Sequence, residues 1–322
     1  MKLLQFVFFI VVICIQATYG VHAQPYPNKQ PVKLIVGFTP GSTIDTVGRL
    51  MAEELHKSLG GTFIVDNRSG AVGVIGSDFV ARSPADGYTL IVSSGSTHSA
   101  APWMFKKLSY DPVADFTHIG RWLQQPYLLV VHPNFPAKNF NEFIEKAKSN
   151  SGKLAFGYGS SSSQIGATSL MALANFQALG VGYKSQPPAL ADLLAERIQF
   201  MVADVAVALP LVNSGKLRAL AVTSLQRSSH LPDVVTIAES GFPGFGYTTW
   251  MGLAGPANMP REVTEKINTE TARLLSRPEI RRRFTSLGLD VVPNSVEDHQ
   301  EFIKNELVIW RKRIIDARIE PE

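Results

Sequence analysis

Two short turns rich in glycine, serine and threonine hold the residues best suited to bind an anion. Each turn follows an expected strand and opens an expected helix, so its backbone N–H groups and hydroxyls can donate hydrogen bonds to a carboxylate. Helix capping alone explains any single turn of this kind, but two turns facing each other across a hinge predict a clamp. The first turn contains Phe38, Thr39, Gly41, Ser42, Thr43 and Asp45, and the second contains Gly159, Ser160, Ser161, Ser162 and Ser163.

Other polar residues also follow expected strands. Ligands of open α/β sheets bind at the carboxyl ends of strands, where these residues are expected. Asp45 either accepts a hydrogen bond from an amine or hydroxyl of the ligand or interacts with the helix dipole. His98 either faces a cleft or lies on the surface, and Asp204 either points into the cleft or starts a turn. The polar loop Ser93–Ser99 supplies the candidates Ser94, Ser96, Thr97 and His98.

The motifs of common enzyme classes are absent from the sequence. There is no Gly-x-Ser-x-Gly elbow and no phosphate loop ending in Gly-Lys-Ser/Thr. Gly70, Gly73 and Gly76 are not spaced as a dinucleotide fingerprint, and the 7 histidines show no paired metal-ligand spacing. The sequence therefore predicts a protein that is not an enzyme, with no cofactor and no metal site. A secreted hydrolase that uses Ser96 or Ser162 is the remaining catalytic alternative.

The elements that position these residues alternate between short β-branched runs and amphipathic stretches, which is typical of an α/β protein with mainly parallel strands. Helices are expected from the first turn to Gly60, over 141–149, from about Gln164 to Ala178, and at the chain end, where Ser295 and Asp298 have capping-box spacing. Strands are expected at Val32–Phe38, Thr62–Asp66, Tyr88–Val92, Leu128–Val131, Leu154–Tyr158, Ile198–Val202 and Ala219–Thr223.

Two cycles of strand, polar turn and helix predict two lobes with a cleft between them. The expected crossings between the lobes are Pro126–Val131 and Thr248–Ala254. Residues 24–125 together with 248–322 then form lobe one, which is discontinuous, and residues 126–247 form lobe two. No low-complexity linker separates them, so hinge strands are expected to join the lobes.

The first residues resemble a cleaved secretory signal. Lys2 precedes an apolar run from Leu3 to Ile15, and Val21-His22-Ala23 provides small residues before the expected cleavage. The run is shorter than the roughly 20 residues of a membrane span, although an uncleaved anchor is the alternative. Residues 1–23 are therefore expected to be a signal peptide that directs the protein to the periplasm. The single cysteine, Cys14, lies within it, so the mature chain has no disulfide.

The charge balance gives only weak guidance. The formal net charge is +4, and the basic clusters Arg281–Arg283 and Arg311–Arg313 fall in helical patterns. Such clusters are typical of solvated helix faces rather than of a nucleic-acid stripe, so no nucleic-acid partner is expected. The mild positive charge is compatible with an anionic small molecule.

Several longer motifs resemble one family. They include Val32–Gly41, Asp66-Asn67-Arg68 with the glycines that follow, Pro84–Leu90, Tyr110-Asp111-Pro112, Gly215–Thr223 and Leu231–Val234. Together they resemble the Bug-type, TctC-like extracytoplasmic solute receptors of tripartite tricarboxylate transporters, from about Tyr26 to Trp310.

This resemblance implies a two-lobed periplasmic-binding-protein fold that closes on a small organic acid, with integral membrane transporter subunits as partners and a monomeric receptor. It also implies that the two turns hold the ligand carboxylate, partly through water, and that Ser93–His98 and Asp204 complete the pocket. The sequence departs from the family pattern at Ser42, at Gln164 and over 180–185. The tricarboxylate of the family name is therefore not carried over, and a ligand-loaded partner of a sensor kinase is an alternative role.

Overall fold

The computed structural model describes residues 26–321. The expected signal peptide, residues 1–23, lies outside the described residues. Within the described range, no helix combines the length and the apolar character that crossing a membrane requires.

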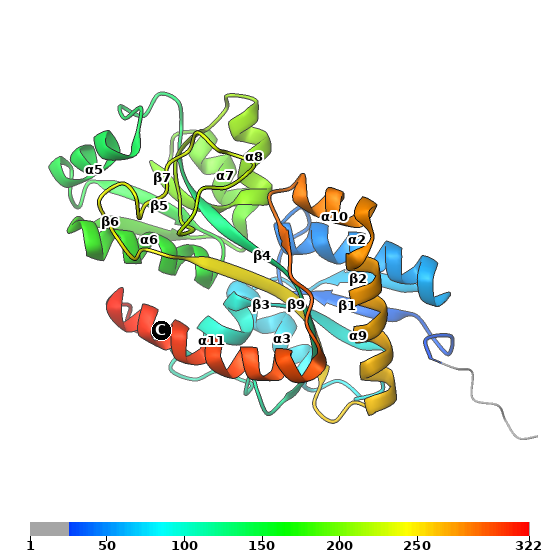
Figure 1. Ribbon diagram of the computed structural model, residues 1–322. Helices are drawn as coiled ribbons and strands as arrows, with labels where there is room; N and C mark the ends of the chain where they lie inside the picture. Colours follow the sequence, from blue (N-terminus) through cyan, green and yellow to red (C-terminus); the bar gives the residue numbers. More distant parts are fainter. Residues whose placement is uncertain (1–25, 322) are drawn as a thin grey trace, which may run out of the picture.

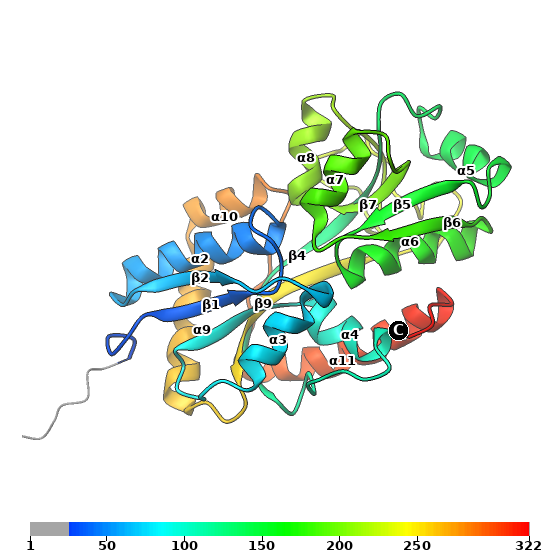
Figure 2. The ribbon, with the colours of Figure 1, turned by 180° about the vertical axis from the view of Figure 1, so that it is seen from behind.

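Two sheets share one long strand (Figures 1 and 2). This strand, β4 (Phe116–Val131), pairs with β9 (Thr248–Pro256) up to Pro126 and with β7 (Phe200–Asp204) from Tyr127 onward. The first sheet runs β2 (Phe63–Asn67), β1 (Val32–Val36), β3 (Thr89–Ser94), β9, β4, with β10 (Asp290–Val291) also on β4. The second sheet contains β4, β7, β5 (Leu154–Tyr158) and β6 (Ala178–Gly182), with β8 (Arg218–Val222) on the other side of β4. The predicted two-lobed α/β architecture is confirmed.

Helices cover both sheets. In lobe one, α2 (Thr43–Leu59), α9 (Arg261–Ser276) and α10 (Pro278–Thr285) share the main hydrophobic core, and α3 (Val74–Ala81) packs on the other sheet face. Lobe two carries α5 (Phe140–Ser149), α6 (Ser161–Ala174), α7 (Gln186–Leu194) and α8 (Val205–Asn213). The remaining segments are the short helical segments Ala71–Gly73 and Ser96–Ala100, α4 (Ala101–Met104), and the last helix, α11 (Val296–Asp316).

Alternation along β1 explains the two cores of lobe one. Leu34 and Val36 belong to the core shared with α2, whereas Ile35 belongs to the core beside α3. The helix α2 begins where the Ser42 side chain accepts a hydrogen bond from the backbone N–H of Asp45, and it ends at Gly60, which adopts the left-handed conformation. The predicted helix up to Gly60 is confirmed.

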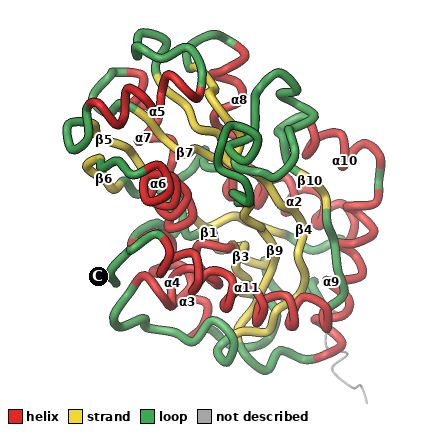
Figure 3. Tube along the Cα trace, turned by 60° about the vertical axis from the view of Figure 1, so that its left-hand side comes forward, coloured by secondary structure: helices red, strands yellow, loops and turns green. Residues whose placement is uncertain are grey.

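The last helix reaches across to the second lobe. It begins as predicted at Ser295, whose side chain accepts a hydrogen bond from the Asp298 N–H at 3.0 Å. Its buried Trp310 packs against Tyr247, with ring centroids 5.5 Å apart, in the core of lobe two. Figure 3 shows this helix passing beside α6. The helix therefore contacts both lobes.

Some element predictions were wrong. The predicted loop Ser93–Ser99 continues β3 to Ser94 and then forms a helical segment, Ser96–Ala100, because its side chains are buried. The serine-rich turn is itself the start of α6, since Ser160 caps a helix that begins at Ser161, three residues before the expected Gln164. The helix ends at Ala174, before left-handed Asn175. The strand β4 is much longer than Leu128–Val131 because it passes through both sheets.

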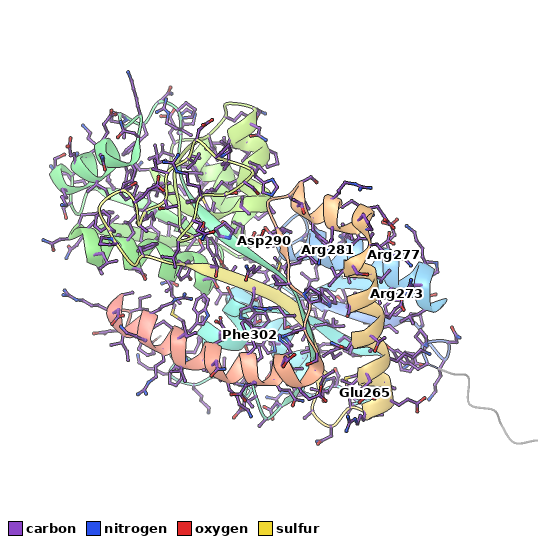
Figure 4. The ribbon with its side chains drawn as sticks, in the orientation of Figure 1. Glu265, Arg273, Arg277, Arg281, Asp290 and Phe302 are labelled. Atoms are coloured by element: carbon purple, nitrogen blue, oxygen red, sulfur yellow. The ribbon has the colours of Figure 1, made fainter. Side chains whose placement is uncertain are left out.

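The basic residues of α9 and α10 lie on an exposed surface of lobe one. Figure 4 shows Arg273, Arg277 and Arg281 along these helices. Arg273 pairs with Glu270, and Arg277 lies 4.0 Å from Glu54. The residues Arg281–Arg283 are exposed, as expected of a solvated helix face.

Candidate functional site

A small cavity of about 30 Å³ lies where the two lobes meet. The residues around it come from the ends of β1, β3, β5 and β7, from the first turns of α2 and α7, and from the strands β4 and β9 that join the lobes. The lining residues are Phe38, Ser42, Thr43, Ile44, Ser94, Ser96, Gln125, Tyr127, Gly159, Ser160, Gln186, Asp204, Thr249, Trp250 and Met251.

The turn after β1 is held in place by Asp45. Its carboxylate accepts hydrogen bonds from the N–H of Gly41 at 2.9 Å, from Nε of Arg49 at 3.0 Å and from Nδ2 of Asn67 at 2.8 Å. Burial opposes the charge, but these hydrogen bonds lower the pKa of Asp45 below its ordinary value. Asp45 does not line the cavity, so its place in the structure is that of an anchor for the turn.

The same turn places Ser42 and Thr43 on the cavity. Gly41 has a φ of 81°, which lets the chain reverse before the helix begins. Ser42 then caps α2, and Thr43, which is buried, also lines the cavity. Thr39 lies one step earlier and contacts the hydroxyl of Ser185 in lobe two. Both hydroxyls and helix N–H groups therefore reach the junction from lobe one.

The second serine turn is built from the start of α6. The hydroxyl of Ser160 accepts a hydrogen bond from the N–H of Ser163 at 3.2 Å, and Ser163 Oγ donates to the carbonyl of Val202 at 2.7 Å. Gly159 lies so close to the next segment that an added Cβ would sit 2.0 Å from the carbonyl carbon of Ser185. Gly159 and Ser160 line the cavity, whereas the hydroxyl of Ser161 is buried without a partner.

Hydroxyl groups join the lobes directly beside the cavity. The Oγ atoms of Ser96 and Ser162 are 2.8 Å apart, and the N–H of Ser162 donates to Ser96 Oγ at 3.2 Å. Ser162 Oγ also lies 3.4 Å from Thr249 Oγ1 on β9. Hydroxyl contacts therefore close the junction between the lobes beside the cavity.

Two predicted candidates, Thr97 and His98, lie behind the cavity wall. Nδ1 of His98 is 2.8 Å from Thr97 Oγ1, and its ring packs edge-on against Phe116 at 4.6 Å. Burial, reinforced by the neighbouring His118 and His299, lowers the pKa of His98 well below its ordinary value. His98 is therefore a neutral core residue, neither in the cleft nor on the surface. Its ring nitrogen contacts Thr97 rather than Ser96, so the structure gives no support to a serine nucleophile.

Asp204 lies on the cavity at the end of β7, where α8 begins. Nε2 of Gln186 donates to its Oδ1 at 3.2 Å. Burial raises the pKa of Asp204 to about 6, and side-chain interactions with Thr43 and Gln125 oppose this shift in part. Of the two readings of Asp204 from the sequence, the structure supports the one that points into the cleft.

The lining residues that sequence reasoning missed come mainly from the joining strands. Gln125 and Tyr127 belong to β4, and Thr249 and Trp250 belong to β9. The predicted crossings between the lobes could have indicated these strands, because a strand that passes between two lobes lies along the floor of the cleft. Gln186 is the first residue of α7, which follows β6 and a short turn. The other residues missed are Ile44 and Met251.

Metal-ligating side chains do not gather anywhere in residues 26–321. No group of three or more histidine, cysteine, aspartate and glutamate side chains in this range is arranged to hold an ion.

Comparisons with known proteins agree on one family. The family model described as "Tripartite tricarboxylate transporter family receptor" matches residues 47–319. Protein BugT of Bordetella pertussis is 32% identical over 293 residues, which cover 90% of this chain and 90% of BugT. The structure titled "R. palustris Rpa4515 with adipate" is 30% identical with a TM-score of 0.90 and covers 92% of this chain and 100% of that chain. The structure of the periplasmic binding protein BugD is 32% identical with a TM-score of 0.87, covering 91% and 99%.

Proposed function

Because the chain belongs to the tripartite tricarboxylate transporter family of receptors, we propose that it captures a small organic carboxylate in the cavity between its two lobes. Family membership identifies the protein as a solute-binding receptor rather than an enzyme, with the two-lobed fold of periplasmic binding proteins. The adipate named for the relative from R. palustris supports a carboxylate as the ligand class.

The observation that carries this proposal is the convergence of helix starts on one cavity. The first turn of α2 comes from lobe one, and Ser160 at the cap of α6 and Gln186 at the start of α7 come from lobe two. Free N–H groups at helix starts carry partial positive charge, which favours a carboxylate. Because the donors belong to different lobes, only the closed form presents them all to the ligand.

The residues proposed to contact the ligand are those of the predicted set that line the cavity or join the lobes beside it. They are Phe38, Thr39, Ser42, Thr43, Ser94, Ser96, Gly159, Ser160, Ser162 and Asp204. Gly41, Asp45, Ser161 and Ser163 shape the two turns, and Thr97 and His98 support the wall from behind.

We also propose the remaining parts of the biological role, which family membership supports. Residues 24–125 with 248–322 form lobe one and residues 126–247 form lobe two, in keeping with the change of partner along β4 after Pro126. The protein is exported by a cleaved signal, works in the periplasm as a monomer, and delivers its ligand to integral membrane subunits of the transporter.

Thermal unfolding tests the proposal. Purified protein is unfolded and refolded to remove any copurified molecule, and is then scanned with di- and tricarboxylates, aromatic carboxylates and amino acids. A carboxylate present at 100 times its dissociation constant stabilises the folded state by about 2.7 kcal/mol. An absence of any shift across the panel would contradict the receptor proposal.

A matched pair of variants places the binding at the cavity. Ser96→Ala removes a hydroxyl on the cavity, and Ser214→Ala removes an exposed hydroxyl on lobe two. A hydrogen bond to a charged ligand contributes about 1.5–3 kcal/mol, so Ser96→Ala should weaken binding by a factor of roughly 10 to 100. Equal affinity of both variants would refute the assignment of Ser96 to the site.

A further inference from the structure

One part of the cavity wall offers hydrogen-bond acceptors rather than donors. Asp204 is the only acidic residue among those that line the cavity, and neither lysine nor arginine lines it. Gln125 and Gln186 lie on the same cavity, and their side chains interact with the Asp204 carboxylate. The negative charge of Asp204 is therefore met by amide groups and by the side chain of Thr43, and it has no positively charged partner among the residues that line the cavity.

Both glutamines have a carbonyl oxygen left over. Gln186 uses its NH₂ group to donate to Asp204 at 3.2 Å, and the side chain of Gln125 interacts with the same carboxylate and lowers its pKa. Oε1 of each glutamine is buried and has no partner, and each residue is 2% exposed. Buried acceptors without partners are costly, so such a pair at a binding cavity points to a donor supplied by the ligand.

A second carboxylate on the ligand does not fit this wall. It would place a negative charge beside the Asp204 carboxylate, and it would place its acceptor oxygens beside the acceptor oxygens of the two glutamines. An ammonium group satisfies both requirements, because it donates three hydrogen bonds and supplies a positive charge beside the Asp204 carboxylate.

Resting on the proposed function, we infer that the ligand of this receptor is an amino carboxylate, whose ammonium group binds at Asp204, Gln125 and Gln186 while its carboxylate binds at the helix starts. The site then attracts the ammonium group of such a ligand, and charge repulsion at Asp204 disfavours dicarboxylates.

Calorimetric titration with paired compounds tests this inference. Each pair keeps the methylene spacer and exchanges one carboxylate for an ammonium: succinate against 3-aminopropanoate, glutarate against 4-aminobutyrate, and adipate against 5-aminopentanoate. A further pair, glutarate against glutamate, adds an ammonium to a dicarboxylate. In the pair of fitting length, the ammonium compound should bind at least about tenfold more tightly.

Variants test whether Asp204 causes the preference. Asp204→Asn should reduce the preference for the ammonium compound by about tenfold or more, and Asp233→Asn, on an exposed loop, should leave it unchanged. If Asp204→Asn fails to fold, Gln186→Met removes one carbonyl acceptor and should reduce the same preference.

The outcomes separate the inference from the function on which it rests. Tight binding of dicarboxylates without a preference for ammonium compounds, or a preference that survives Asp204→Asn, overturns the inference and leaves the carboxylate receptor standing. Failure of every carboxylate to bind refutes the receptor proposal itself.

Discussion

Replacing Asp204 by asparagine should stabilise the ligand-free protein at neutral pH. The pKa of this carboxyl is raised by burial from 3.8 to about 6. The folded protein therefore holds the proton to higher pH than the unfolded chain does, and the folded state loses stability as the pH rises from 3.8 through 6. The gap of about two pH units corresponds to a penalty of about 3 kcal/mol once the group is fully ionised.

The expected net gain is smaller than this penalty. Asparagine offers one acceptor oxygen and one NH₂ group, so one of the hydrogen bonds from the glutamines is lost, at a cost of about 1 kcal/mol. Asp204→Asn should therefore raise the free energy of unfolding by about 2 kcal/mol at pH 7.5, which corresponds to a Tm higher by roughly 4 °C for a chain of this size. At pH 4.5 the remaining penalty is about 1 kcal/mol, so the gain should fall to about zero.

Thermal unfolding of the two proteins at pH 7.5 and pH 4.5 measures the difference. Asp233→Asn, which removes one exposed negative charge, controls for the change in net charge. A lower Tm for Asp204→Asn than for the wild type at pH 7.5, or a Tm difference that is the same at both pH values, would refute the reasoning about a desolvated carboxylate at the cavity.

Other variants probe the framework around the cavity. Asp45→Asn weakens the hydrogen bonds from Gly41, Arg49 and Asn67, so the free energy of unfolding measured with urea should fall by about 1–3 kcal/mol; a change below 0.5 kcal/mol would contradict its role as an anchor. Gly159→Ala forces a Cβ against the backbone of Ser185, so we expect this variant to lose stability or ligand affinity. A well-folded variant with wild-type affinity would contradict the need for this close contact. Burial lowers the pKa of His118 from 6.5 to about 4, so the folded state loses stability as the pH falls below 6.5. Between pH 7.5 and 5 the free energy of unfolding of His118→Phe should fall by about 2 kcal/mol less than that of the wild type. Equal losses in the two proteins would contradict this.

The two turns were predictable from sequence as helix starts, and their proposed carboxylate binding uses the same residue types as helix capping. Serine at a helix start satisfies the N–H groups of the first turn, and the same position exposes donors to a ligand. Ser42 and Ser160 therefore cap helices and line the cavity at once.

The floor of the cavity was beyond local sequence signals. Thr249 lies in the predicted crossing Thr248–Ala254 and Gln125 lies just before the crossing Pro126–Val131, but nothing in their neighbourhood along the chain shows which side chains face the cavity. Only the pairing of β4 with β9 brings them together, with Gln125 opposite Thr249. His98 illustrates the converse, because the polar loop pattern placed it either at a cleft or on the surface, whereas tertiary packing buries the side chain completely.

Hydrogen–deuterium exchange with and without a bound carboxylate tests the central claim most directly. The compound used is whichever of glutarate, glutamate and adipate gives the largest thermal shift. Capture between the lobes predicts slower exchange in both turns, residues 38–45 and 159–163, because each turn gains contacts when the lobes close on the ligand. Protection confined to one turn, or lying away from both, would contradict a cavity completed by the two lobes together.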